Sequence, residues 1–329
     1  MNPISEPAAP PKVSVLMLTH NHAQFINDAI SSVYRQTIFS HTELLIGEDA
    51  SSDATARLCD QAQHRDPNRI KVMSSPGGPL GFHRNFARLL ALARAPYVAF
   101  LEGDDWWIDP TKLEQQLSLL EAKPHLAFCG SHTRVVDQRS RRMAEVGSQP
   151  ADGRIGPPPG MDELDFQDLI GSYTFHFSSV LMRREAVQLP HWIYQQYCLD
   201  RPLYLLAATK GAAGVIGAET SAYRLHDGGV WAPLSPLEKA KRSRDLFRTF
   251  CRYFPKVYRS KFDLALHGIL MGYLAESLRL QTKSQTARLL AMSIWACPYQ
   301  ALFRQHRFTI GMTRLLVMPR RNSSVAAPS

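Results

Sequence analysis

The sequence predicts an α/β protein in which helices flank a parallel sheet, followed by a mostly helical, basic C-terminal region. In the first half, short apolar runs alternate with segments of helical periodicity, as in sheets covered by helices. Polar residues follow the C-terminal end of successive apolar runs. From about residue 233 the pattern changes to apolar helical stripes interleaved with Lys and Arg. We therefore expect a disordered tail at 1–12, an α/β domain at 13–232 and a helical basic region at 233–329.

Short apolar runs bounded by polar turns predict the strands. The first run, Val13–Thr19, ends in the polar turn His20-Asn21-His22, and the fourth continues directly into the acidic turn at 102–105. The expected strands, in chain order, are 13–19, 44–47, 70–73, 97–101, 177–183 and 221–226.

Apolar spacing and N-terminal signals predict the helices between these strands. Ile26, Ile30 and Val33 recur at helical spacing, and Asp53 offers an N-cap for the next helix. Pro110 stands at the first turn of another helix, where proline is tolerated. The expected helices are 25–33, 53–65, 82–93, 110–122 and 199–209.

Three polar segments end predicted strands: Thr19-His20-Asn21, Glu48-Asp49 and Asp104-Asp105. In open α/β sheets, ligands bind outside the carboxyl ends of the strands. We therefore expect these three segments to converge on one crevice.

Composition and cysteine usage indicate a globular protein of a reducing compartment. Apolar residues make up 45% of the 329 residues and charged residues 20%, which is typical of globular domains. The five cysteines are widely spaced and form no CxxC pair, which argues against a disulfide framework and a zinc site. The N-terminus lacks the basic and apolar regions of a secretory signal, and no run of eighteen apolar residues occurs. A cytoplasmic location is expected.

The positive charge is confined to the C-terminal region. Residues 233–329 contain 17 Lys/Arg and 4 Asp/Glu, a net of +13, whereas residues 1–232 contain 21 and 25, a net of −4; together they give +9. The slightly acidic first part speaks against nucleic-acid binding by the whole chain. The basic region instead suggests contact with an anionic membrane surface or packing on the α/β domain with its charges in water.

The acidic turn Glu102-Gly103-Asp104-Asp105 is the strongest chemical signal in the chain. Clustered carboxylates repel one another unless a cation or strong donors neutralise them. Mg²⁺ and Mn²⁺ accept carboxylate oxygens and keep positions open for phosphate oxygens. The alternative is a solvated acidic turn that caps the following helix.

Several motifs, found in order across about residues 13–228, resemble those of the family-2 inverting glycosyltransferases. The matching segments are Thr19-His20-Asn21, Ser32-Val33-Tyr34-Arg35-Gln36-Thr37, Glu48-Asp49-Ala50-Ser51-Ser52-Asp53, Gly81-Phe82-His83-Arg84-Asn85, Glu102-Gly103-Asp104-Asp105, Asp200 and Tyr223-Arg224-Leu225-His226. Glu48 and Glu102 depart from the family pattern, which has Asp at both positions. The Q-x-x-R-W motif of processive synthases is absent, so a chain-extending synthase is not expected.

The resemblance implies a GT-A fold for the domain at 13–232, a nucleoside-diphosphate sugar donor (UDP-sugar above all), a divalent metal and inversion at the anomeric carbon. It implies that Asp49 accepts the base N–H, that His20 stacks on the base, and that Asp104 and Asp105 hold ribose and the metal–diphosphate. The implied donor-binding residues are Thr19, His20, Asn21, Asp49, Arg84, Asn85 and Asp104, and the implied metal ligands are Asp105, Glu102 and His226.

Sugar transfer needs a base that takes the proton of the acceptor hydroxyl. Asp200 is the only acidic residue between Glu185 and Glu219 and stands where the family has its catalytic carboxylate. A helix N-cap, or a partner for Arg201, is the alternative for Asp200. The expected acceptor is a saccharide or a lipid-linked saccharide of cell-surface polysaccharide synthesis, which would place the protein peripherally at the inner membrane face.

Two other function classes remain open at the level of sequence. A sugar-phosphate nucleotidyltransferase also combines an α/β sheet with a divalent ion, but such enzymes usually carry a Gly-rich basic loop after the first strand, where this chain has His20-Asn21-His22-Ala23. A non-catalytic nucleotide-sugar-binding module is the second alternative.

Overall fold

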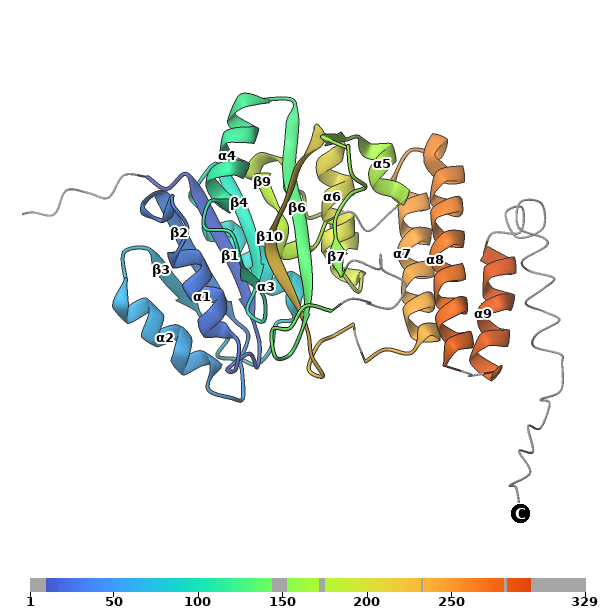
Figure 1. Ribbon diagram of the computed structural model, residues 1–329, viewed down its shortest axis with the longest axis horizontal. Coiled ribbons are helices and arrows are strands. Elements are labelled where there is room, and N and C mark those ends of the chain that lie inside the picture. Colours follow the sequence, from blue (N-terminus) through green and yellow to red (C-terminus); the bar gives the residue numbers. More distant parts are fainter. Residues whose placement is uncertain (1–9, 144–152, 172–174, 232, 281–282, 297–329) are drawn as a thin grey trace, which may run out of the picture. The chain divides into compact units, whose positions relative to one another are not determined.

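A computed structural model describes residues 10–143, 153–171, 175–231, 233–280 and 283–296 (Figure 1). The chain divides into two compact units, Met1–Ala232 and Pro233–Ser329. Most of the tail predicted to be disordered lies outside the described residues. At its end, the backbone N–H of Lys12 donates to the carbonyl of His41 at 2.8 Å, so the chain is already held there.

The first unit is built on one sheet whose strand order is β3-β2-β1-β4-β9-β6-β10-β5. Its first four strands are parallel, and the central strand β1 pairs with β2 on one side and β4 on the other. The apolar runs of the three inner strands, β1, β2 and β4, are buried on both faces, as parallel strands covered by helices require. These strands are β1 (Val13–Thr19), β2 (Thr42–Glu48), β3 (Ile70–Met73) and β4 (Tyr97–Glu102).

The second half of the sheet is mixed rather than parallel. The short strand β9 runs antiparallel to both β4 and β6, while β6 and β10 are parallel to each other. The predicted strand at 177–183 is thus a short 3-10 helix, η2, followed by β9. The remaining strands are β5 (Trp106–Trp107), β6 (Leu126–Asp137), β7 (Arg154–Ile155), β8 (Glu163–Leu164), β9 (Leu181–Arg183) and β10 (Ala212–Leu225).

Helices cover both faces of this sheet (Figure 1). On one face, Val15 and Met17 of β1 share a core with Ile30 of α1, Ala62 of α2 and Leu117 of α4. On the other, Phe86 of α3 packs against Phe100 of β4, with ring centroids 5.4 Å apart. The helices of the first unit are α1 (Ile26–Tyr34), α2 (Thr55–Arg65), α3 (Phe82–Leu92), α4 (Lys112–Ala122), α5 (Phe166–Gly171) and α6 (Asp200–Ala208), with 3-10 turns η1 (Phe39–His41), η2 (Phe177–Ser179), η3 (Arg184–Ala186) and η4 (His191–Gln195).

The second unit is helical within its described residues. It contains α7 (Pro236–Tyr253), η5 (Lys256–Tyr258), α8 (Arg259–Arg279) and α9 (Lys283–Ala296). Ser235 and Glu238 form a capping box that fixes the start of α7. The segment from 247 to 262 is broken at Pro255, and its phenylalanines are buried in the helical core. No described helix is long and apolar enough to cross a bilayer. The predicted helical region beyond residue 296 lies outside the described residues.

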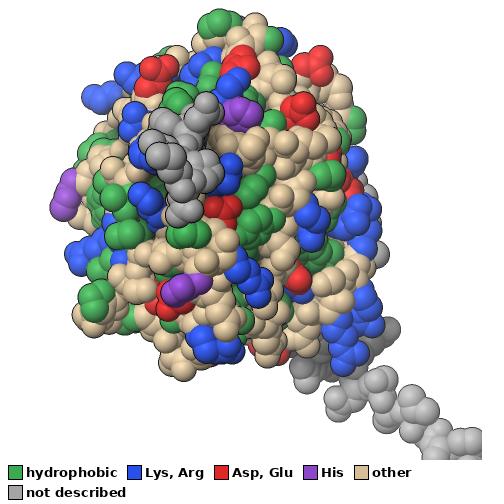
Figure 2. All heavy atoms as spheres, turned by 90° about the vertical axis from the view of Figure 1, so that its left-hand side faces the viewer, with side chains coloured by type: hydrophobic (Ala, Val, Ile, Leu, Met, Phe, Trp, Pro, Cys, Tyr) green, Lys and Arg blue, Asp and Glu red, His purple; other side chains and the backbone are tan. Residues whose placement is uncertain are grey.

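Charge on the face shown in Figure 2 is mixed: Lys and Arg side chains are interspersed with Asp and Glu. They form no continuous field of one sign there, which agrees with the small net charge of residues 1–232.

Candidate functional site

The strand order reverses between β1 and β4, and the polar ends of both strands meet there. The chain moves outward from β1 to β2 and β3, then returns to place β4 on the other side of β1. Gly103 follows β4 and donates its N–H to the carbonyl of Leu18 at 2.8 Å. A Cβ at position 103 would lie 2.5 Å from Oγ1 of Thr19 and 2.9 Å from Nδ1 of His22. Glycine therefore permits the acidic turn to touch the end of β1, at the place where α/β sheets bind ligands.

The turn after β1 is tied to the loop after β2. Nδ1 of His20 donates to the carbonyl of Asp49 at 2.7 Å, and its Nε2 accepts from the amide of Asn21 at 3.1 Å. Asn21 has a φ of 56°, a left-handed conformation that asparagine tolerates, and its side-chain oxygen accepts from the N–H of Ser52. His20 and Asn21 are exposed, so both side chains lie at the surface beside the end of β1.

Asp49 is buried and holds the loop that precedes α3. Its Oδ1 accepts from the N–H of Leu80 at 2.7 Å and from the hydroxyl of Ser75, and its Oδ2 accepts from the N–H of Gly81 at 2.9 Å. Both carboxylate oxygens are therefore already engaged within the protein. A contact with a nucleotide base would have to share or replace one of these hydrogen bonds.

The side-chain hydrogen bonds of Asn85 join it to β2 and to Arg88 rather than to the acidic turn. Asn85 is buried, donates to the carbonyl of Gly47 and accepts from Nε of Arg88, which itself donates to the carbonyls of Glu48 and Met73. Asn85 thus joins α3 to β2, and a ligand contact is not needed to explain it. Arg84 is exposed on α3, and no hydrogen bond or ion pair joins it to another described residue.

Asp104 faces two histidines. Its Oδ2 lies 3.0 Å from Nε2 of His226 and 3.5 Å from Nε2 of His22, and the two imidazole rings are nearly perpendicular. Burial opposes ionisation of Asp104, but the hydrogen bond from His226 and the charge of His22 outweigh it and lower its pKa. Asp104 is therefore the carboxylate of the turn that is most readily ionised.

Asp105 is turned the other way, into the protein. Its Oδ2 accepts from the hydroxyl of Ser178 at 2.6 Å, its Oδ1 accepts from the N–H of Arg224 at 3.0 Å, and His176 lies 3.5 Å away. Burial, followed by the negative charge of Asp104, raises the pKa of Asp105. The two adjacent aspartates thus serve different sets of partners.

Glu102, Asp105 and His176 offer ligand atoms that all lie within 4.8 Å of one another. Burial and the charges of Asp104 and Asp105 raise the pKa of Glu102, and burial lowers the pKa of His176 to about 4. A neutral imidazole and two carboxylates that repel each other are a donor set that a divalent cation would stabilise. The predicted ligand His226 is not part of this triad, since it contacts Asp104.

Asp200 is the first residue of α6 and lies close enough to act electrostatically on the acidic turn. Its charge contributes to the raised pKa of Glu102 and of Tyr223, in both cases after larger causes. The side chain of Glu102 remains 30% exposed between the buried partners. The structure therefore brings Asp200, Glu102, Asp104 and Asp105 into one electrostatic neighbourhood.

The sequence analysis assigned no individual role to Ser178 or Arg224. Ser178 joins the turn at two points, since it also accepts from the N–H of Glu102. Arg224 donates to the carbonyl of Asp104 and lies 4.5 Å from the ring centroids of both Phe25 and Trp106. The R in the Tyr223-Arg224-Leu225-His226 segment was the available signal for Arg224. No sequence signal pointed to Ser178, because it lies in η2, 73 residues from its partner Asp105.

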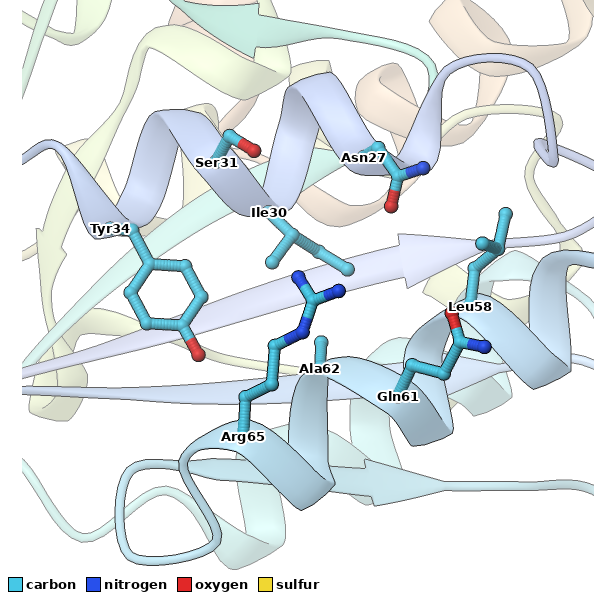
Figure 3. A pocket seen from close by; sticks show the side chains of 8 residues that line it. All are labelled: Asn27, Ile30, Ser31, Tyr34, Leu58, Gln61, Ala62 and Arg65. Atoms are coloured by element: carbon cyan, nitrogen blue, oxygen red, sulfur yellow. The ribbon is translucent and has the colours of Figure 1, made fainter.

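A small cavity of about 60 Å³ lies elsewhere, between α1 and α2 (Figure 3). Tyr34, Ile30 and Arg65 are among its lining side chains, and none of the predicted site residues contributes to it. Ligand pockets for small molecules are typically about 300–1,000 Å³. This cavity is too small for a nucleotide sugar.

Comparison with known proteins identifies related sequences. The family model described as "Glycosyl transferase family 2" matches residues 14–189. An uncharacterized protein of Mycobacterium tuberculosis is 27% identical over 221 residues, which cover 67% of this chain and 60% of that protein. The putative teichuronic acid biosynthesis glycosyltransferase TuaG of Bacillus subtilis is 30% identical over 185 residues, 55% of this chain and 67% of TuaG. The match thus spans only about three fifths of the mycobacterial relative.

Solved structures share the fold. TarS of S. aureus, crystallised in complex with UDP-GlcNAc, superposes with a TM-score of 0.63 at 16% identity, covering 93% of this chain and 90% of that chain. The mannosyltransferase PcManGT of Pyrobaculum calidifontis, in complex with GDP-Man and Mn²⁺, gives a TM-score of 0.57 at 17% identity, covering 94% and 86%.

Proposed function

The chain belongs to glycosyl transferase family 2, and from this premise we propose that it transfers a sugar from a nucleoside-diphosphate sugar to a saccharide or lipid-linked saccharide. The expected GT-A type fold is confirmed by the likeness to TarS. The proposed donor is a UDP-sugar, the transfer inverts the anomeric carbon, and it is not processive. The complex of TarS with UDP-GlcNAc supports the choice of donor.

The observation that carries the proposal is the acidic turn 102–105, which follows β4 at the reversal point of the sheet and lies within electrostatic reach of Asp200. This geometry provides one group for each requirement of sugar transfer. The acidic turn can hold a cation against a diphosphate, and Asp200 can take the proton of the attacking hydroxyl. Thr19, His20 and Asn21, at the end of β1, are proposed to bind the nucleotide part of the donor.

A divalent cation, Mn²⁺ or Mg²⁺, is the proposed cofactor. When bound, it would offset the negative charge that develops on the departing diphosphate. Asp105, Glu102 and His176 would hold it as one set, and Asp104 with His226 forms the neighbouring set. The Mn²⁺ in the complex of the mannosyltransferase supports this choice.

Asp200 is proposed as the general base. Proton transfer by a positioned side chain typically contributes about 10²–10⁴-fold to the rate. Asp49 is proposed to act on the nucleotide through the loop at 75–81 that it holds, as well as by any direct contact with the base.

The acceptor is proposed to belong to cell-surface polysaccharide synthesis. The name of the relative TuaG, a putative glycosyltransferase of teichuronic acid biosynthesis, supports this assignment. Acceptors of this class carried on lipid would require the protein to reach a membrane surface from the cytoplasm.

A donor screen tests the proposal. UDP-, GDP- and dTDP-sugars are incubated with the protein, Mn²⁺ and candidate acceptors, and release of the free diphosphate is measured. We expect release from a UDP-sugar and none when EDTA is present. Pyrophosphate release from a nucleoside triphosphate and a sugar phosphate would instead indicate a nucleotidyltransferase. Tight metal-independent UDP binding with no donor turnover would indicate a binding module.

A further inference from the structure

Two apolar side chains at the turn between α7 and α8 are exposed. Tyr253 is 52% exposed and Val257 is 76% exposed. Their neighbours Phe250, Phe254 and Phe262 are buried and pack against one another, with the centroids of Phe250 and Phe262 5.6 Å apart. The buried phenylalanines anchor the turn, so the two exposed side chains are presented on a fixed base.

Cations flank this exposed pair in the sequence. Residues 246–262 contain five Lys/Arg and no Asp/Glu. All five are exposed: Arg248, Arg252, Lys256, Arg259 and Lys261. We call Tyr253, Val257 and these five cations the α7–α8 tip.

Acidic residues border the tip in sequence. Asp245 precedes the segment and pairs at 2.8 Å with Arg244, while Arg248 lies 3.9 Å from the same carboxylate. Asp263 follows the segment and is partly buried. Residues 246–262 themselves contain no carboxylate, so this segment carries a net charge of +5.

We propose that the α7–α8 tip docks on an anionic lipid surface, with Tyr253 and Val257 in the headgroup boundary and the five cations against lipid phosphates. An exposed aromatic ring and an exposed aliphatic side chain within a basic segment are the combination that interfacial anchors use. A second copy of the chain is disfavoured, since facing tips would bring like charges together. This inference rests on the proposed function only in supplying a reason for docking, the lipid-linked acceptor.

The tip replaces the wider surface that the sequence suggested. The sequence suggested membrane contact by the basic region as a whole, but its Phe247 and Phe262 are each 1% exposed within the helical core. They cannot enter lipid without unfolding the unit. Membrane contact is therefore assigned to Tyr253 and Val257.

The test is co-sedimentation of the full chain with phosphatidylcholine vesicles that either contain or lack phosphatidylglycerol. We expect sedimentation only with the anionic vesicles and release at about 1 M salt, where the screening length falls to about 3 Å. Lys256→Glu combined with Arg259→Glu should weaken partitioning by about tenfold or more. Tyr253→Ser combined with Val257→Ser should weaken it without changing the charge.

Matched controls lie in the first unit. Leu92 is 43% exposed on α3 and Lys71 is exposed on β3, so Leu92→Ser and Lys71→Glu change exposed residues of the same kinds. Both controls should sediment like the wild type. Release of UDP from donor is measured on every variant, because the tip lies outside the proposed catalytic machinery and turnover without vesicles should be unchanged.

The outcomes separate the two proposals. Absence of wild-type binding to anionic vesicles, or wild-type binding by both tip variants, would overturn the docking proposal whatever the donor assay gives. If only the Lys256→Glu/Arg259→Glu protein lost binding and the Tyr253→Ser/Val257→Ser protein bound like the wild type, the docking proposal would be overturned. The tip would then bind polyanions through charge alone, with no insertion into lipid. Loss of donor turnover in the wild type would count against the proposed function and leave the docking result standing.

Discussion

Asp104 and Asp105 are adjacent in the chain, but their carboxylates point to different partners. Asp104 meets His226 and His22, whereas Asp105 is held by Ser178 and by the backbone of Arg224. Hydrogen bonding and positive charge lower the pKa of the first, and burial raises the pKa of the second. The turn thus presents one carboxylate that ionises readily beside one whose charge needs a cation to be stable.

The role of Asp200 yields the prediction at this scale. Asp200→Asn keeps the size of the side chain but cannot accept the acceptor's proton, so turnover should fall by about 10²–10⁴-fold. UDP affinity, measured by calorimetry, should stay within a small factor of the wild type, because the base acts on the acceptor. Strongly weakened UDP binding in this variant would show that Asp200 belongs to the donor site instead.

Some site residues could be recognised from the sequence and others could not. The sequence analysis singled out the carboxylates of the turn, because they are adjacent in the chain and follow an apolar strand. The binding role expected for Asn85 stays a prediction; the structure buries Asn85 against Gly47, where a Cβ would collide with its side chain. Ser178 escaped notice because a hydroxyl some 70 residues from its partner leaves no local pattern.

At the scale of elements, α4 buries the side-chain amino group of a lysine. Lys112 is fully buried, donates to Gln116 at 2.6 Å, and its Nζ lies 4.4 Å from the ring centroid of Trp107. Burial lowers its pKa to about 7. The amino group is therefore neutral in much of the folded protein just above neutral pH, while the unfolded chain still binds the proton.

This difference predicts a pH dependence of stability. Between the folded pKa of about 7 and the usual unfolded value of about 10.4, the unfolded state holds one more proton, so the free energy of unfolding rises with pH. The slope from this group is about 1.4 kcal/mol per pH unit at most. Lys112→Met removes it. Urea unfolding of both proteins across this window should show the wild type gaining stability relative to the variant. Parallel profiles would mean that Lys112 keeps its proton when buried.

Elements with strong local patterns were the ones that sequence could define. The strand at Ile70–Met73 has the predicted bounds, and α3 and α6 differ from prediction by a residue at their ends. The first part of β10 was missed, since Ala212, Gly214 and Gly217 give weak strand preference and the strand is held by its long pairing with β6. The antiparallel direction of β9 could not be foreseen, because pairing direction depends on contacts distant in sequence.

For the whole molecule, the two units divide the charge and the proposed tasks. The first unit holds the acidic turn at the reversal point of its sheet, within electrostatic reach of Asp200. The second unit contains the basic α7–α8 tip. Their compositions already differed in sequence, with nets of −4 and +13. Periodicity could not predict which apolar residues of the second unit remain exposed, because α7 and α8 bury most of their apolar side chains against each other.

The most direct test of the central claim is calorimetric titration of UDP into the full chain with Mn²⁺ and again with EDTA. We expect UDP to bind with Mn²⁺ and to bind at least about tenfold more weakly with EDTA. We expect a similar loss of UDP affinity in Asp104→Asn with Mn²⁺ present. Asp60→Asn, which changes an exposed carboxylate on α2, should bind like the wild type. Equal UDP affinity with Mn²⁺, with EDTA and in Asp104→Asn would contradict the assignment of the acidic turn as the metal–diphosphate site.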